Sequence, residues 1–142
     1  MNDLHPFLVH FPVALLTVAL FFEAAGILLK RDDFARTAWW TQVVGTLGAY
    51  AAILSGLMAE KTLKVNGALK EVLEMHKQLA FLIAAVFSVL ALWRIGTRGA
   101  LPVRNRVLYL AAFLTGAVLL WIGAWYGGEL VFRYGAGSQP VP

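Results

Sequence analysis

The three histidines of this 142-residue chain are its clearest candidates for binding or catalytic chemistry. His5 and His10 stand in the opening stretch LHPFLVHFP, at the start of a long apolar run. His76 stands in EMHKQL, where another apolar run begins. Imidazole nitrogens ligate haem iron, zinc and copper. An ionisable side chain at membrane depth is costly and marks a candidate functional site.

The elements that must position these histidines are apolar helices. The chain is 60% hydrophobic and 14% charged, whereas a soluble domain is about a quarter charged. A helix needs about 20 apolar residues to cross a bilayer, and the third run reaches that length only by including His76. We predict one all-α domain over residues 1–142, an integral membrane four-helix bundle in a lipid bilayer. Its predicted spans are residues 7–29, 38–59, 76–94 and 107–126.

The orientation follows from basic residues around the first span. No Lys or Arg precedes it, and Lys30, Arg31 and Arg36 follow it. Connections rich in Lys and Arg remain in the cytoplasm. We therefore predict both termini on the outer, periplasmic side of a prokaryotic inner (plasma) membrane, with the first span retained rather than cleaved. The histidines then share an outer layer with Glu60 and Glu129.

Two prolines flank the candidate ligands on the first span. Pro6 suits the first turn of a helix, whereas Pro12 removes a backbone donor and its ring crowds the carbonyl of Leu8. The sequence therefore predicts either a kinked helix beside His10 or a regular helix that begins only near Phe11. In both cases we expect Pro12 to aim His10 into the bundle.

Four segments carry a resemblance to a known family. LHPFLVHFPVALL, GLMAE, EMHKQL and GGELVFRYGAG resemble the small four-helix membrane proteins catalogued as DUF2231, over nearly the whole chain. Glu60 departs from the Asp that is frequent in that family. Members of the family resemble modules found beside or fused to Rieske-type and cytochrome c-type domains. The resemblance thus implies electron transfer at the outer face.

The main functional hypothesis is a b-type haem protein that acts in electron transfer, rather than a stand-alone enzyme. His10 and His76 come from different helices in one layer, as bis-histidine ligation in a bundle requires. His5 could replace His10, bind a haem propionate or serve a second site. Arg133 and Lys77 would balance propionate charge, and Tyr134 lies in a glycine-rich tail that would cover the helix ends. The expected partners are a periplasmic cytochrome c or Rieske-type protein, a larger redox complex, or a second copy of the chain.

Two other classes remain open. His5, His10, His76 and Glu60 offer ligands for a non-haem zinc or copper site. A cofactor-free structural subunit or small-solute channel needs only close helix packing. The absence of cysteine excludes thiolate sites and covalent c-type haem. The basic residues fall in short connections, so no nucleic-acid partner is expected.

Small residues and one buried acid complete the predicted bundle. Gly48, Ala52 and Gly56 recur every four residues, and the last span carries similar glycines. Such stripes let helices approach closely, or leave a flat wall for a planar cofactor. Glu23 lies within the first span, where we expect a structural role with Thr41 or Gln42 as its partner.

Overall fold

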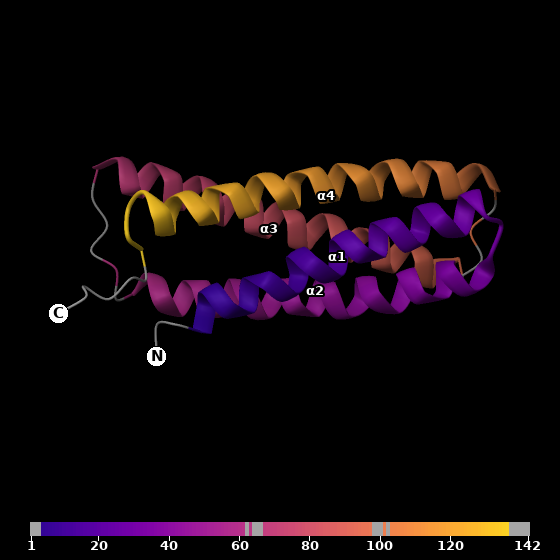
Figure 1. Cartoon of the computed structure of the whole chain (residues 1–142), viewed down its shortest axis with the longest axis horizontal. Coiled ribbons are helices and arrows are strands. Elements are labelled where there is room, and N and C mark those ends of the chain that lie inside the picture. Colours follow the sequence, from indigo (N-terminus) through magenta and orange to yellow (C-terminus); the bar gives the residue numbers. More distant parts are fainter. Residues whose placement is uncertain (1–3, 62, 64–66, 98–100, 102, 137–142) are drawn as a thin grey trace.

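Four long helices make up the protein. The computed structural model describes residues 4–61, 63, 67–97, 101 and 103–136. All four helices are long and apolar enough to cross a membrane, which confirms the predicted all-α membrane fold (Figure 1). They are α1 (Leu4–Leu28), α2 (Asp32–Glu60), α3 (Gly67–Gly96) and α4 (Val103–Phe132).

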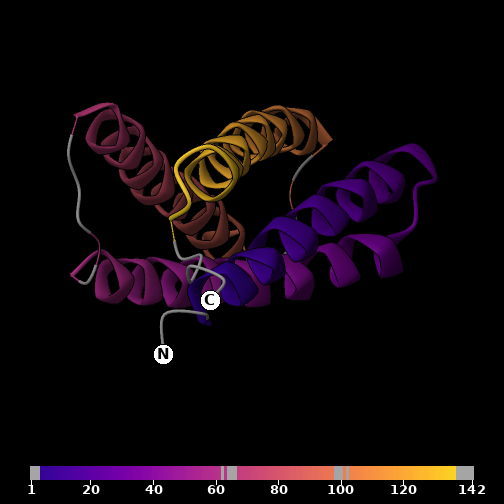
Figure 2. The ribbon, with the colours of Figure 1, turned by 60° about the vertical axis from the view of Figure 1, so that its left-hand side comes forward.

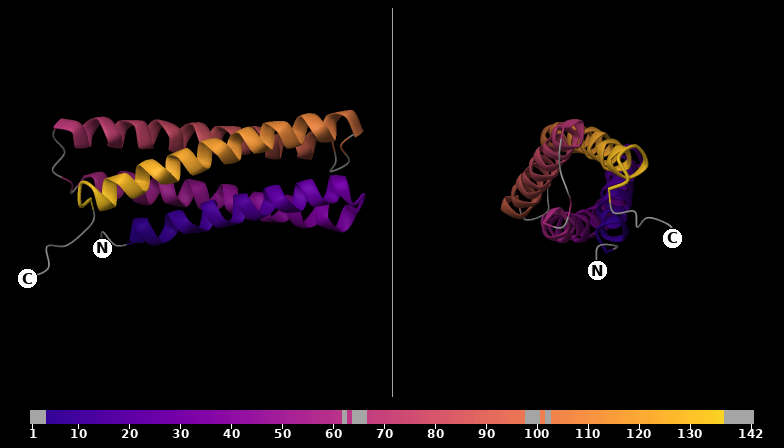
Figure 3. Two further views of the ribbon diagram at one scale, coloured as in Figure 1. Left: turned by 45° about the horizontal axis from the view of Figure 1, so that its top comes forward. Right: turned by 90° about the vertical axis from the view of Figure 1, so that its left-hand side faces the viewer.

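The helices form two antiparallel pairs. α1 packs along most of α2, and α3 packs along α4, whereas the contacts of α2 with α3 and of α1 with α4 are narrower (Figures 2 and 3). The helix termini gather at two opposite ends of the bundle (Figure 1). We call one the histidine end, where α1 and α3 begin and α2 and α4 end. The other is the arginine end, where α1 and α3 end and α2 and α4 begin.

The α1–α2 connection is much tighter than the segment KRDDFART predicts. Only residues 29–31 separate the two helices. Lys30 has a φ of 53°, and the Arg31 amide donates to the Gly26 carbonyl oxygen at 3.1 Å, which is a helix-ending arrangement. A Cβ on Gly26 would lie 3.0 Å from the Ala35 amide nitrogen. The helices thus pack closely from the turn onward. Asp32 lies in the first turn of α2, where a negative side chain stabilises the positive end of the helix dipole.

The third and fourth spans are also longer than predicted. α3 begins at Gly67 rather than at His76, and α4 continues to Phe132 rather than ending at residue 126. Beyond α4, Gly135 has a φ of 64°, and the Ala136 amide donates to the Leu130 carbonyl oxygen at 2.8 Å. The segment GGELVF, which lies beyond the fourth predicted span, is therefore the last part of α4.

Pro12 lies inside α1, which is helical from Leu4. The alternative in which regular helix begins only near Phe11 is therefore wrong. Pro12 is buried and faces a glycine of α2, because a Cβ on Gly48 would lie 3.5 Å from the Pro12 Cδ. The ring that cannot donate a hydrogen bond is used as a packing surface between the paired helices.

Aromatic packing fills the core between the pairs. Phe87, Tyr109 and Phe113 have no exposed surface, and the rings of Phe87 and Phe113 meet edge to face with centroids 5.1 Å apart. Large apolar side chains such as Phe21 and Leu92 are about two-thirds exposed, at 65% and 66%. An apolar outer surface of this kind matches a lipid environment.

Candidate functional site

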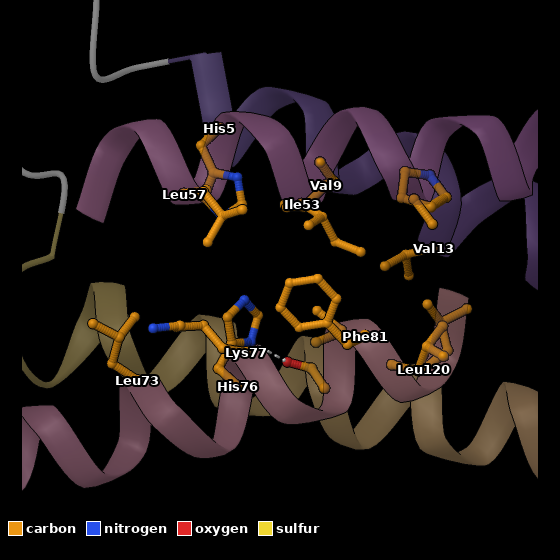
Figure 4. Close-up of a pocket in the computed structure, with 18 of the residues that line it drawn as sticks. His5, Val9, Val13, Ile53, Leu57, Leu73, His76, Lys77, Phe81 and Leu120 are labelled. Carbon is orange, nitrogen blue, oxygen red and sulfur yellow. Dashed lines mark hydrogen bonds between the residues drawn. The ribbon is translucent and has the colours of Figure 1, made fainter. Parts of the chain in front are cut away.

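A cavity of about 110 Å³ lies between the two helix pairs toward the histidine end. All four helices line it. Its walls are apolar, and Figure 4 shows His5 and His76 facing one another from opposite pairs. The ionisable lining residues are His5, Glu60, His76 and Lys77. The remaining side chains that define its walls include Val9, Val13, Ile53, Phe81 and Leu120.

His5 is held by α2, the partner of its own helix. Its Nδ1 lies 2.9 Å from the Ser55 Oγ. That hydroxyl donates its only proton to the Ala52 carbonyl oxygen, also at 2.9 Å, so it accepts from His5. The Nδ1 of His5 therefore carries the ring proton, and its Nε2 is the ring nitrogen with a free lone pair.

His76 is held in the same way by α4. Its Nδ1 lies 3.0 Å from the Gly123 carbonyl oxygen. A carbonyl only accepts hydrogen bonds, so Nδ1 is the protonated nitrogen and Nε2 again holds the lone pair. A hydrogen-bonded Nδ1 with an available Nε2 is the arrangement that fixes the tautomer and orientation of metal-ligating histidines.

The two imidazoles form a pair across the cavity. Their ring centroids are 6.5 Å apart and their planes are inclined by 78°. Within the described part of the chain, neither Nε2 has a hydrogen-bond partner. Two lone-pair nitrogens on separate helix pairs, with apolar walls around them, provide the donor set of a bis-imidazole metal centre.

Glycines make room for both rings. A Cβ on Gly56 would lie 2.9 Å from the His5 Cε1, and one on Gly127 would lie 3.1 Å from the His76 Cε1. Both distances are too short for an unadjusted contact. The small-residue stripes predicted from the sequence therefore allow close packing. At these two positions an imidazole packs against the glycine.

Glu60 and Lys77 pair across the rim of the cavity. The Lys77 Nζ donates to the Glu60 Oε1 at 2.8 Å and to the Glu74 Oε1 at 3.2 Å. Both Lys77 and Glu60 are about a quarter exposed. The pair joins α3 to α2, and its charges compensate each other in the structure.

His10 does not enter the cavity, so the expectation that it projects into the bundle is wrong. It is exposed, and its Nδ1 lies 2.6 Å from the Pro6 carbonyl oxygen on its own helix. Within the described residues, no group of three or more His, Cys, Asp or Glu is arranged to hold a metal ion. His5, His10, His76 and Glu60 are thus not brought together as one closed site.

The supporting residues at the end of α4 lie apart from the cavity. Arg133 is exposed and donates from Nη1 to the Glu129 Oε1 at 2.7 Å. That hydrogen bond raises the pKa of the Arg133 guanidinium above its already high ordinary value. Arg133 also lies over the Tyr134 ring, 5.6 Å from its centroid. None of these three side chains lines the cavity.

A second polar cluster lies toward the arginine end, around Glu23, the acid that the sequence predicts in a structural role within the first span. Glu23 is 2.5 Å from the Arg94 Nη1, and both side chains are almost fully buried, at 2% and 6% exposure. The partner of Glu23 is thus Arg94, not Thr41 or Gln42. Arg94 was missed because it is the last residue of the third predicted span, where a basic side chain is expected to reach water. The useful signal was its position directly after an apolar run, at a depth where Glu23 needs a counter-charge.

Gln42 extends this cluster between the helix pairs. Its Nε2 donates to the Phe87 carbonyl oxygen at 3.3 Å, and its Oε1 accepts from the Tyr109 hydroxyl at 2.5 Å. Arg94 also donates to the Ala35 carbonyl oxygen at 2.8 Å. The buried polar groups therefore bond to one another, as they must in a low-dielectric interior.

The comparisons with known proteins add a family. A family model described as a predicted membrane protein, DUF2231, matches residues 2–140. None of the curated proteins and none of the solved structures compared with the chain matches it.

Proposed function

Since this chain belongs to the DUF2231 family of membrane proteins, we propose that it is a membrane-embedded metal-centre protein in which His5 and His76 bind the iron of a b-type haem for electron transfer. One observation carries the proposal. The two imidazoles face each other across an apolar cavity, each with its Nδ1 held by an oxygen and its Nε2 free.

The side chains of the cavity suit haem in kind. Bis-histidine ligation uses neutral imidazoles from facing helices, and the apolar walls suit the faces of a porphyrin. Lys77 lies at the polar rim, where it can exchange Glu60 for a propionate. The bound haem would supply one-electron exchange, and the protein would supply ligand orientation and exclusion of water.

The size of the cavity sets a condition on haem binding. At about 110 Å³ it is smaller than the roughly 300–1,000 Å³ typical of small-molecule pockets. A porphyrin therefore requires the helix pairs to move apart at the histidine end. The hydrogen bonds of the ligands are compatible with this movement, because His5 is tied within the α1–α2 pair and His76 within the α3–α4 pair.

The same volume supports a second candidate, a non-haem zinc or copper ion. An ion needs no separation of the helix pairs, since a water-sized ligand needs only about 10–15 Å³ of such space. His5 and His76 supply two nitrogens, and Glu60 also lines the cavity. Among the described residues Glu60 is not grouped with both histidines for metal binding, so it would become a ligand only by moving toward them; its Oε1 alone is used by Lys77.

The proposed setting follows from the charge bias of the sequence. We place the histidine end at the outer face of a prokaryotic inner membrane, because Lys30, Arg31 and Arg36 follow α1 and no basic residue precedes it. The centre would there exchange electrons with a periplasmic cytochrome c or Rieske-type protein, or within a larger redox complex or homo-oligomer. A C-terminal reporter fusion tests the placement, and a cytoplasmic C-terminus would overturn it.

Visible spectroscopy of the detergent-purified protein tests the haem proposal. From cells with an adequate haem supply, we expect a Soret band and sharp α and β bands after dithionite reduction. His5→Ala and His76→Ala should each abolish the reduced spectrum. His10→Ala is the matched control, because it removes the exposed histidine of the same helix and should leave the spectrum intact.

Metal analysis of the same samples separates the candidates. A colourless protein with about one copper or zinc per chain, lost in both His5→Ala and His76→Ala, would replace haem by the second candidate. A colourless protein without metal would refute both. Restoration of the spectrum when imidazole is added to His76→Gly would show that the residue acts as a ligand rather than as a packing element.

A further inference from the structure

A second and larger cavity lies at the arginine end. Its volume is about 350 Å³, and residues from all four helices or their ends line it. Three arginines, Arg36, Arg94 and Arg106, contribute to its lining, but only two carboxylates, Glu23 and Asp32, do so. The cavity thus carries an excess of positive charge, and it is independent of the histidine site.

The charges of the cavity divide into a floor and a mouth. Glu23 and Arg94 form the floor, where both side chains are buried and neutralise each other at 2.5 Å. Arg36 is exposed at the mouth, and within the described part of the chain it forms no ion pair. The surplus positive charge therefore belongs to the mouth, where water or a ligand can reach it.

Arg106 is held in place with part of its guanidinium unused. Its Nε donates to the Leu101 carbonyl oxygen at 3.0 Å. Its Nη2 is 3.5 Å from the Asp32 Oδ1, and the Asp32 side chain is 82% exposed. A pair this long and this exposed contributes little. A stronger anion can therefore take the place of Asp32 at the terminal nitrogens of Arg106.

Helix polarity does not decide the charge of this cavity. α2 and α4 begin at the arginine end, and α1 and α3 finish there, so the positive and negative ends of the helix dipoles offset one another. The first turn of α2 also contains Asp32 and Asp33. The arginine side chains are therefore the main determinant of the site.

We propose that this cavity binds the phosphate group of an anionic phospholipid. Guanidinium groups match phosphate oxygens in planar, bidentate geometry, and the mouth supplies Arg36 and Arg106. A lipid is the favoured source because the cavity lies at one end of a membrane-spanning bundle, where basic pockets between helices bind lipid headgroups. Ile27, Trp39 and Leu101 also line it, which gives an acyl chain and its glycerol an apolar approach.

The test uses the full chain in detergent with phosphatidylglycerol, phosphatidylcholine or inorganic phosphate added. Native mass spectrometry measures which lipid stays bound, and thermal unfolding measures which addition stabilises the protein. We expect the protein to retain and be stabilised by phosphatidylglycerol in preference to phosphatidylcholine. Arg36→Gln with Arg106→Gln should weaken phosphatidylglycerol binding by about tenfold or more, from the loss of two charge-assisted contacts. Lys70→Gln with Arg133→Gln removes equal charge at the histidine end, where both side chains are exposed, and should retain the preference.

Each other outcome overturns the proposal. If the Arg36 and Arg106 double variant still prefers phosphatidylglycerol over phosphatidylcholine as strongly as the wild type does, the cavity does not hold the headgroup. If the Lys70 and Arg133 control variant also loses its preference for phosphatidylglycerol, the preference comes from the net positive charge of the protein and not from this cavity. Stabilisation by millimolar inorganic phosphate that also displaces the lipid would assign the site to a soluble phosphate. If the double variant does not fold, Arg36→Glu alone carries the same test at an exposed position.

Discussion

Replacing Arg94 by leucine should strongly destabilise the bundle. Arg94 is almost fully buried and lies 2.5 Å from Glu23. It also donates to the Ala35 carbonyl oxygen at 2.8 Å. Arg94→Leu leaves the carboxylate buried without its counter-charge and the carbonyl without this donor, while leucine fills part of the volume.

The expected loss follows from these two contacts. Breaking a buried ion pair by removing one partner costs about 3–5 kcal/mol, and a lost hydrogen bond to a buried acceptor adds about 1 kcal/mol. Arg94→Leu should therefore lower the free energy of unfolding by about 4–6 kcal/mol, or roughly three to four powers of ten in the unfolding constant. The Glu23→Leu, Arg94→Leu double variant should recover most of this loss, because apolar replacement of both charges is often neutral.

Unfolding in mixed micelles, titrated with sodium dodecyl sulfate and followed by tryptophan fluorescence and circular dichroism, measures both variants. The reasoning is refuted if Arg94→Leu lies within about 1 kcal/mol of the wild type, a change typical of exposed pairs. It is also refuted if the double variant is as unstable as Arg94→Leu, since the loss would then come from packing rather than from an isolated charge.

Three further predictions concern the remaining contacts. Gly127→Ala should displace the imidazole that it contacts and reduce cofactor or metal content, measured by absorbance and elemental analysis, whereas Gly128→Ala, whose Cβ meets only a ring carbon at 4.0 Å, should not. Ser55→Ala removes the acceptor of the His5 Nδ1 proton and should weaken metal affinity by about 10- to 100-fold in a competition titration; an unchanged affinity would contradict the assigned tautomer. Tyr109→Phe should lower the free energy of unfolding in the micelle assay by about 1 kcal/mol, and no change would show that its 2.5 Å hydrogen bond adds no stability.

Composition and hydropathy were sufficient to predict the four spans, because crossing a bilayer imposes length and apolarity on every helix. They were insufficient for the helix ends. Asp32 and Asp33 look like connecting residues by charge, yet the first turn of α2 contains both and its dipole favours them. The last part of α4 was likewise not predicted, because its sequence contains glycines, which usually weaken helices. One of them, Gly127, packs here against the imidazole of His76.

The choice between His5 and His10 shows where sequence reasoning stopped. Five residues at 3.6 per turn separate their directions by about 140° around the helix, so both cannot enter the same cavity. Which one does so depends on where α2 packs against α1. That contact is set by Gly56, which leaves room for the His5 ring, and by Ser55, which accepts its proton. The proline argument that favoured His10 ignored this partner surface.

The two ends of the bundle are joined in different ways, and this difference bears on the proposed cofactor. Toward the arginine end, buried hydrogen bonds of Arg94 and Gln42 link the two helix pairs directly. From the middle of the bundle to the histidine end, the polar contacts between the pairs among the described residues are exposed or only partly buried. They join Lys77 to Glu60, Trp121 to Thr17 and Tyr50 to Ser88, and such contacts are weak by comparison. Opening should therefore occur at the histidine end, about a fixed arginine end. Because each imidazole is bonded within its own pair, such opening would widen the space between the two Nε2 atoms without disturbing the tautomer of either ring.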